Sequence, residues 1–153
     1  MKKAFTLVEL LIVVSILGIL GAIVLPAIKA NAQEAKESNA RTNLHMLRNA
    51  IEIFAIQHND IPPGYLGNNP ANNATIAAFS VQLTHINFGK YLSEMPENPF
   101  NNKYEAMMLQ NIDVFPAEPT ETDTYGWIYK PATKMIKLNW AGTDSQGAAY
   151  FDY

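Results

Sequence analysis

The sequence predicts an α+β chain in which one long N-terminal helix packs on a small antiparallel β-sheet. Three observations support this fold class. An apolar run at the start continues without a break into an amphipathic helical pattern, prolines and a glycine then end that pattern, and two alternating segments near the C-terminus are joined by a short turn. The 153 residues are enough for one modest domain and an anchor.

The first element is the apolar run of residues 5–28, in which Glu9 is the single charge. Residues 10–28 carry no charge and are about long enough to cross a bilayer as a helix. Lys2 and Lys3 favour a cytoplasmic N-terminus, so the rest of the chain would lie outside. Because an acid in hydrocarbon costs roughly 3 kcal/mol, Glu9 is expected to have a function.

The helix is expected to continue to residue 57, since residues 29–57 form its amphipathic second half. Apolar residues alternate at spacings of four and three, which places them on one helical face. They are Ala40, Leu44, Leu47, Ile51 and Phe54. The sequence Asn-Asp-Ile-Pro-Pro-Gly at residues 59–64 then ends the helix, because it cannot continue through successive prolines.

The remaining elements are shorter. We expect a second helix over residues 74–84, a turn-rich segment over 93–102 and a strand over 104–109. Residues 125–129 and 135–139 alternate in the manner of strands and can be joined by residues 130–134 as an antiparallel hairpin.

Composition and motifs exclude several kinds of function. The chain has no cysteine, so disulfides, thiolate zinc sites and cysteine catalysis are excluded. Its net charge of -3 argues against nucleic-acid binding. His45, His58 and His85 are isolated, and no nucleophile, metalloprotease, phosphate-loop or dinucleotide motif is present. The sequence therefore predicts a protein that is not an enzyme.

Three interpretations of the N-terminus follow from the residues. A secretory signal peptide would be cut after Ala32 in the small-x-small pattern Ala30-Asn31-Ala32, but its apolar part would be too long and the cut would interrupt the helical pattern. A plain membrane anchor explains hydrophobicity and orientation, with Glu9 near the headgroups. The third interpretation accounts for the basic residues, the apolar run and Glu9 together, and it rests on a resemblance.

Residues 2–11, KKAFTLVELL, resemble the N-terminus of the type IV pilin and pseudopilin family. The resemblance implies that a prepilin peptidase removes leader residues 1–4 by cutting between Ala4 and Phe5, and that Phe5 is then N-methylated. Ala4 departs from the usual glycine, so slower processing is expected. Pro26 falls at the family's helix-kinking position, and proline loosens the preceding turn.

The resemblance also gives Glu9 a role. Cleavage creates a positive amine on Phe5, and the carboxylate of Glu9 on a neighbouring subunit can neutralise it, which offsets two desolvation penalties. Ser15, Gly18 and Ala22 recur at helical spacing, and Gly18-x-x-x-Ala22 is a small-xxx-small pattern that suits helix packing in lipid.

The body resembles type II secretion pseudopilins of the major kind more loosely, through residues 95–100 and 140–153. In that group the C-terminal loop often binds calcium. Asp144 and Asp152 are the candidate charged ligands here, with Ser145 as a further oxygen donor. A plain turn is the alternative for this loop.

The expected function is that of a structural subunit of a type II secretion pseudopilus, with a leader at residues 1–4, a membrane and assembly helix at 5–28 and a periplasmic domain at 29–153. The resemblance implies a single pass through the inner membrane and a homo-oligomeric filament. It also implies contacts with minor pseudopilins, a prepilin peptidase, the inner-membrane assembly platform and its ATPase. The alternatives are a type IV pilus subunit for adhesion, motility or DNA uptake, and an anchored or secreted binding domain that never polymerises.

Overall fold

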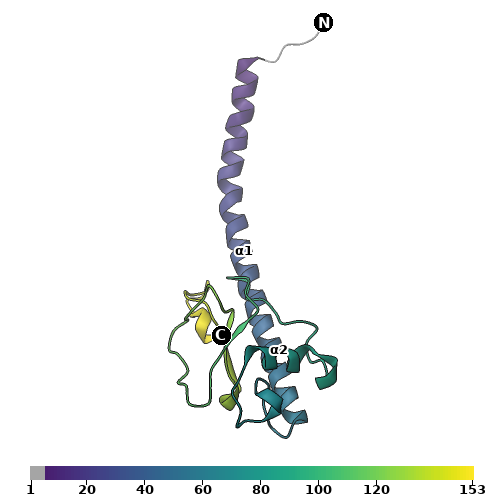
Figure 1. Ribbon diagram of the computed structural model, residues 1–153. Helices are drawn as coiled ribbons and strands as arrows, with labels where there is room; N and C mark the ends of the chain where they lie inside the picture. Colours follow the sequence, from purple (N-terminus) through teal and green to yellow (C-terminus); the bar gives the residue numbers. More distant parts are fainter. Residues whose placement is uncertain (1–5) are drawn as a thin grey trace. The chain divides into compact units, whose positions relative to one another are not determined.

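A computed structural model describes residues 6–153, apart from the side chains of residues 23 and 25–27. The long helix α1 runs over Leu7–Gln57, and it confirms the predicted helix and its end (Figure 1). The chain divides into two compact units, residues 1–35 and Lys36–Tyr153, so that α1 contributes to both.

The C-terminal end of α1 is fixed by local backbone geometry. Asn59 and Asp60 both adopt left-handed φ angles, of 55° and 62°, and the N–H of Asp60 donates to the carbonyl of Ala55 at 2.8 Å. His58 stacks on Phe54 with ring centroids 3.9 Å apart, and its Nδ1 lies 2.8 Å from the Phe54 carbonyl oxygen. This histidine is therefore a structural residue at the end of the helix.

The predicted apolar stripe of α1 forms the core of the second unit. All five of its residues are buried, and they pack with side chains from the second helix and the sheet. The fully buried partners with the largest side chains are Trp127, Tyr129, Phe79, Leu83, Ile136 and Leu138. Burial of such side chains contributes about 1.5–3 kcal/mol each.

The second helix, α2, spans Ile76–Thr84 and confirms the prediction. Thr75 caps it, because the Thr75 hydroxyl accepts the N–H of Ala78 at 3.1 Å. Short 3₁₀ turns complete the helical structure: η1 at Leu66–Asn68, η2 at Ile86–Phe88, η3 at Pro131–Thr133 and η4 at Tyr150–Asp152.

The sheet has three strands in the order β1-β2-β3: β1 at Ala106–Met108, β2 at Trp127–Lys130 and β3 at Met135–Leu138. β2 and β3 form the predicted antiparallel hairpin. β1, however, is parallel to β2, so the sheet is mixed and the expectation of an antiparallel sheet was wrong in this respect. The long segment between β1 and β2 returns the chain to the end from which it started, which a parallel pair requires.

Asn98 joins the turn-rich segment to the sheet. Its side chain is fully buried, and its amide nitrogen donates to the carbonyl of Gly126 at 3.0 Å. Its Oδ1 accepts the N–H of Phe100 at 3.0 Å, while its backbone N–H donates to Lys103. One side chain therefore satisfies polar backbone groups of two segments.

Replacing Asn98 by alanine is expected to destabilise the body by about 2–4 kcal/mol, because the Phe100 N–H and the Gly126 carbonyl would each lose a buried partner. Thermal melting of the full chain in detergent micelles, followed by near-ultraviolet circular dichroism, measures the loss. Asn73 is an exposed loop residue, and Asn73→Ala is the control expected to melt like the parent. Equal melting of the two variants would contradict the role of Asn98.

Candidate functional site

Thr6 and Glu9 form a capping box at the N-terminus of α1. One carboxylate oxygen of Glu9, Oε2, accepts the backbone N–H and the hydroxyl of Thr6, both at 2.8 Å. The Thr6 hydroxyl oxygen in turn accepts the N–H of Glu9 at 3.2 Å. This reciprocal pattern satisfies N–H groups that a helix terminus leaves free. Ala4 and Phe5, the predicted processing site, lie outside the described residues.

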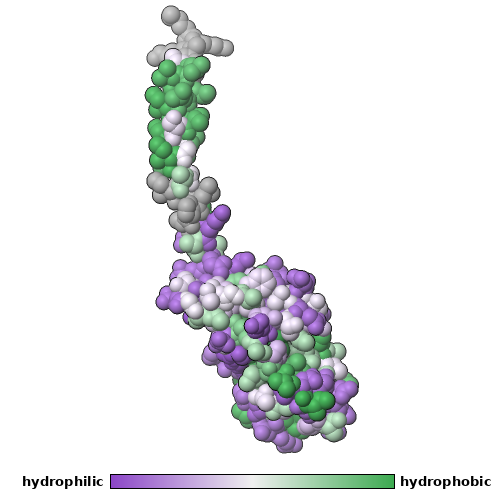
Figure 2. Space-filling model, turned by 90° about the vertical axis from the view of Figure 1, so that its left-hand side faces the viewer, coloured by the Kyte–Doolittle hydropathy of each residue, from purple (hydrophilic) through white to green (hydrophobic). Residues whose placement is uncertain are grey.

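Apolar side chains cover most of α1 over residues 7–20, as the green atoms in Figure 2 show. Every described Leu, Ile and Val between residues 7 and 20 is exposed. A helix that is apolar on all sides is suited to lipid or to partner helices. In the described part of the chain, no helix meets in both length and hydropathy what a bilayer crossing requires.

The predicted packing residues lie on this helix. Ser15 donates its hydroxyl to the carbonyl of Leu11 at 2.8 Å, so its polar group is satisfied within its own helix. A Cβ added at Gly18 would meet no atom within 4 Å, and Ala22 is exposed. Both positions are thus open to a neighbouring helix. α1 continues through Pro26, whose side chain and predicted kink lie outside what the structure describes.

The C-terminal loop is organised around Asp144, whose side chain is fully buried. Oδ1 of Asp144 accepts the backbone N–H groups of Gln146 and Ala148, each at 2.8 Å. Its other oxygen, Oδ2, accepts the hydroxyl of Tyr153 at 2.9 Å and is paired with the guanidinium of Arg41 on α1. Each of the two carboxylate oxygens of Asp144 therefore has two hydrogen-bond partners.

The electrostatics of this cluster keep Asp144 ionised. Burial opposes ionisation and is the largest single effect, whereas the hydrogen bonds from Tyr153 and from the two loop N–H groups favour it. With the charge of Arg41, they lower the pKa of the Asp144 carboxyl below its usual value. The side chain of Tyr153 and the charge of Asp144 also raise the pKa of Arg41, whose guanidinium lies 4.3 Å from the centre of the Tyr153 ring.

Glu37, one turn before Arg41 on α1, is the second anchor of the loop. It is buried, and its Oε1 accepts the hydroxyl of Tyr150 at 2.9 Å. Its other oxygen accepts the hydroxyl of Ser145 at 3.4 Å. Residues four apart on a helix share a face. Glu37 and Arg41 therefore present a carboxylate and a guanidinium to the same loop.

These residues do not fit a calcium ion. Calcium requires six to eight oxygen ligands, whereas both Asp144 oxygens are engaged by N–H, O–H and guanidinium donors. Ser145 is directed to Glu37, and Asp152 pairs with Lys137 at 3.3 Å on the surface. Within the described residues, no three acidic, histidine or cysteine side chains form a group that could hold a metal.

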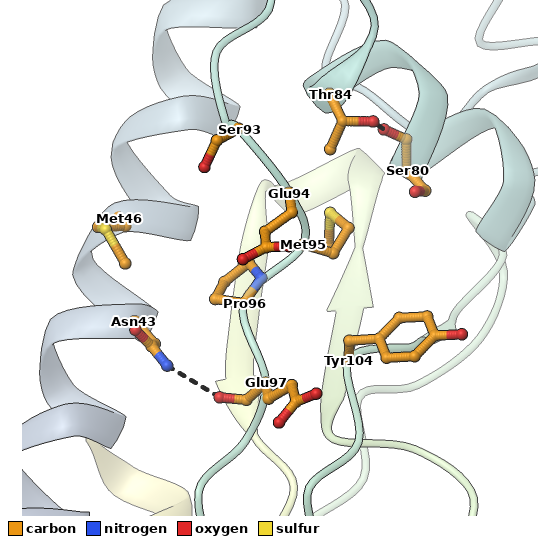
Figure 3. Close-up of a pocket in the computed structure, with 10 residues that line it drawn as sticks. All are labelled: Asn43, Met46, Ser80, Thr84, Ser93, Glu94, Met95, Pro96, Glu97 and Tyr104. Carbon is orange, nitrogen blue, oxygen red and sulfur yellow. Dashed lines mark hydrogen bonds between the residues drawn. The ribbon is translucent and has the colours of Figure 1, made fainter.

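A groove of about 770 Å³ lies between α1, α2 and the segment around Pro96 (Figure 3). Asn43 closes one side by donating its amide to the carbonyl of Glu97 at 2.8 Å. The Thr84 hydroxyl donates to the carbonyl of Ser80 within α2. Among the described residues that line it there is no histidine, lysine or arginine, and its charged side chains are Glu94 and Glu97.

Sequence reasoning missed two features of these sites. The capping box is visible in the sequence as Thr6-x-x-Glu9, followed by an apolar run. The loop anchors Glu37 and Arg41 have no such signal, because they lie more than a hundred residues from Ser145, Tyr150 and Asp144. Only the fold brings them together.

The N-terminal residues match a known family model. Residues 1–25 match the model described as the prokaryotic N-terminal methylation motif. This stretch includes the capping box and the exposed apolar side chains of residues 7–20. No solved structure matches the chain.

Several curated proteins are similar over most of the chain. It is 28% identical over 117 residues to type II secretion system core protein G of Aeromonas hydrophila, covering 74% of this chain and 80% of that protein. The core protein G of Vibrio cholerae serotype O1 is 29% identical over 117 residues, covering 74% and 78% of the two chains. A fimbrial protein of Neisseria meningitidis serogroup B is 28% identical over 109 residues, covering 71% of this chain and 64% of its own length.

Proposed function

We propose that this chain is a member of the type IV pilin and type II secretion pseudopilin family, and that it is a structural subunit of a type II secretion pseudopilus. The observation that carries the proposal is the match of residues 1–25 to the N-terminal methylation motif. Similarity to core protein G over 74% of the chain supports the secretion role in particular.

The proposed maturation begins with a prepilin anchored in the inner membrane. Prepilin peptidase removes residues 1–4 on the cytoplasmic side, and the new terminal residue, Phe5, is N-methylated. The helix of residues 5–28 then serves as the anchor, and residues 29–153 lie in the periplasm. The exposed apolar side chains between residues 7 and 20 support this role, because a helix with such a surface needs lipid or partner helices around it.

In the proposed filament, the N-terminal helices of neighbouring subunits pack together. The Glu9 carboxylate of one subunit neutralises the Phe5 amine of another, which sets the register between helices. Gly18 and Ala22 permit close approach of the backbones, since both sites are open in the single chain. Pro26 allows the helix to bend locally in the filament. Minor pseudopilins, the assembly platform and its ATPase are the proposed partners.

The body is proposed to act by shape and not by catalysis. The groove beside Pro96 has hydroxyl groups but no histidine, lysine or arginine among its described lining residues, and activation of a hydroxyl nucleophile commonly uses a nitrogen base beside it. Its buried polar side chains, such as Asn98 and Asn139, serve backbone groups of the fold. A globular domain carried on a helix that packs with its neighbours suits a filament subunit.

A type IV pilus subunit is the second candidate, and the similarity to a Neisseria meningitidis fimbrial protein favours it. The fimbrial match covers 64% of that protein, whereas the core protein G of Aeromonas hydrophila is covered to 80%. The secretion role is therefore the better supported of the two.

Deletion and complementation of the gene in the source organism test the proposal. Loss of exported proteins from the culture medium is expected, with recovery when the parent chain is supplied and unchanged surface pili throughout. The proteome of the medium and electron microscopy of the cell surface measure the two effects. Normal export together with loss of surface pili would contradict the secretion role and support the pilus role.

A further inference from the structure

We propose that the guanidinium of Arg41 closes the C-terminal loop in the place of a metal ion, so that the body of this protein folds without calcium. The loop in question comprises residues 142–150. The inference concerns the stability of the single chain, and it does not depend on whether the filament serves secretion or adhesion.

The loop already uses its own polar groups. The N–H of Asp144 donates to the Ala148 carbonyl at 2.8 Å, and the Asp144 carbonyl accepts the N–H of Gly147 at 3.1 Å. The carbonyl of Gly142 accepts the N–H of Tyr150 at 3.1 Å. Three carbonyl oxygens that could otherwise serve as metal ligands are thus engaged in the loop itself. A calcium ion would have to compete with each of these bonds for its six to eight oxygens.

Closure of the loop also requires a positive charge beside the buried carboxylate of Asp144. An ionised carboxylate with no exposed surface is costly unless it is paired and hydrogen-bonded. The side chain of Asp144 is fully buried, and Arg41 supplies the charge while its own side chain stays 54% exposed. Tyr153 completes the arrangement by donating its hydroxyl to Asp144 and placing its ring against the guanidinium. The cation of this site is therefore provided by α1.

Glu37, on the same face of α1 as Arg41, is also hydrogen-bonded to the loop. A second carboxylate near the loop could have served as a calcium ligand, but its two oxygens accept the hydroxyls of Tyr150 and Ser145. The charged residues that tie α1 to the loop are thus each satisfied by protein groups. A metal ion has no role left to fill in the closure of this loop.

The first test is calcium itself. The full chain in detergent micelles is melted in millimolar calcium chloride, a concentration that fills even weak extracellular sites, and in EGTA, with magnesium chloride as the matched control. Near-ultraviolet circular dichroism reports on the body, because Trp127 is buried in its core. The same melting temperature in all three solutions is expected. A rise of several degrees with calcium alone would overturn the proposal.

The second test is a double-mutant cycle on the pair. Arg41→Met and Asp144→Asn are each expected to lower the melting temperature by about 5 °C or more. The double variant is expected to lose little more than the larger single loss, because the two residues act as a unit. Additive losses would overturn the role of Arg41. Should Arg41→Met not fold, Arg41→Lys keeps the charge without the planar fork and should show an intermediate loss.

Lys36→Met provides the control for loss of a basic residue on α1. Lys36 is exposed and lies one residue before Glu37 on the same helix. It is expected to melt within about 1 °C of the parent, since surface substitutions away from such clusters have small effects. A loss equal to that of Arg41→Met would assign the effect to net charge and would also overturn the proposal.

Discussion

Replacing Glu9 by glutamine is expected to leave the chain inserted in the membrane but to reduce filament assembly by at least about a hundredfold. Glutamine is also a capping-box residue, so it can still accept the Thr6 N–H and keep the helix terminus intact. It cannot neutralise the amine of Phe5 on a neighbour. Removing one member of a charge pair in a non-polar setting costs about 3–5 kcal/mol, which corresponds to a factor of roughly 10² to 4 × 10³.

The measurement compares the sheared filament fraction with the membrane fraction by immunoblot. Thr6→Ala is the matched control, because it removes the two hydrogen bonds of the Thr6 hydroxyl but keeps the Glu9 carboxylate and costs only about 1 kcal/mol. This control should assemble, provided that its mass shows complete processing. If Glu9→Gln forms normal filaments, the charge-pairing role is wrong. If Thr6→Ala fails equally, the cap is itself required for assembly, and the loss cannot be assigned to the charge of Glu9.

Replacing Gly126 by alanine is expected to prevent the body from folding stably. An added Cβ would lie 2.0 Å from the backbone oxygen of Lys103 and 3.1 Å from the Cβ of Asn98. The Lys103 carbonyl cannot move away without breaking its bond with the N–H of Asn98. Because the clash is with backbone, we expect a loss of about 4 kcal/mol or more, at the upper end for a single substitution.

Thermal melting in micelles measures this loss as a fall of at least about 10 °C. Gly147→Ala is the control: its Cβ would meet no atom within 4 Å, but its φ of +84° is unfavourable for alanine. That variant should lose only about 1 kcal/mol from backbone strain. A Gly126→Ala chain as stable as Gly147→Ala would contradict the close approach of the Lys103 carbonyl to Gly126.

The elements with a strong local pattern were predictable from the sequence. The apolar stripe of α1 and the hairpin of β2 and β3 both follow from side-chain periodicity, and both are confirmed. The direction of β1 was not predictable in this way. A strand pattern has the same period in either direction, so only the path of the segment between β1 and β2 decides that the pair is parallel.

The candidate sites also differ in whether a local sequence pattern reveals them. Thr6 and Glu9 are three residues apart, so their capping box can be read from the sequence. Arg41 and Asp144 are 103 residues apart, and no local pattern connects them. The calcium expectation for Asp144 rested on the resemblance of this loop to that of the major pseudopilins. The loop sequence contains the carboxylate but not the guanidinium that neutralises it.

The central claim is that the chain matures as a pilin-like subunit, and the intact mass and terminal residue of the mature protein test it most directly. The protein purified from membranes of the source organism should begin at N-methylated Phe5 and lack residues 1–4. A chain that retains Met1 would indicate a plain anchor, and one that begins at Gln33 would indicate a secretory signal peptide. Either result would contradict the account.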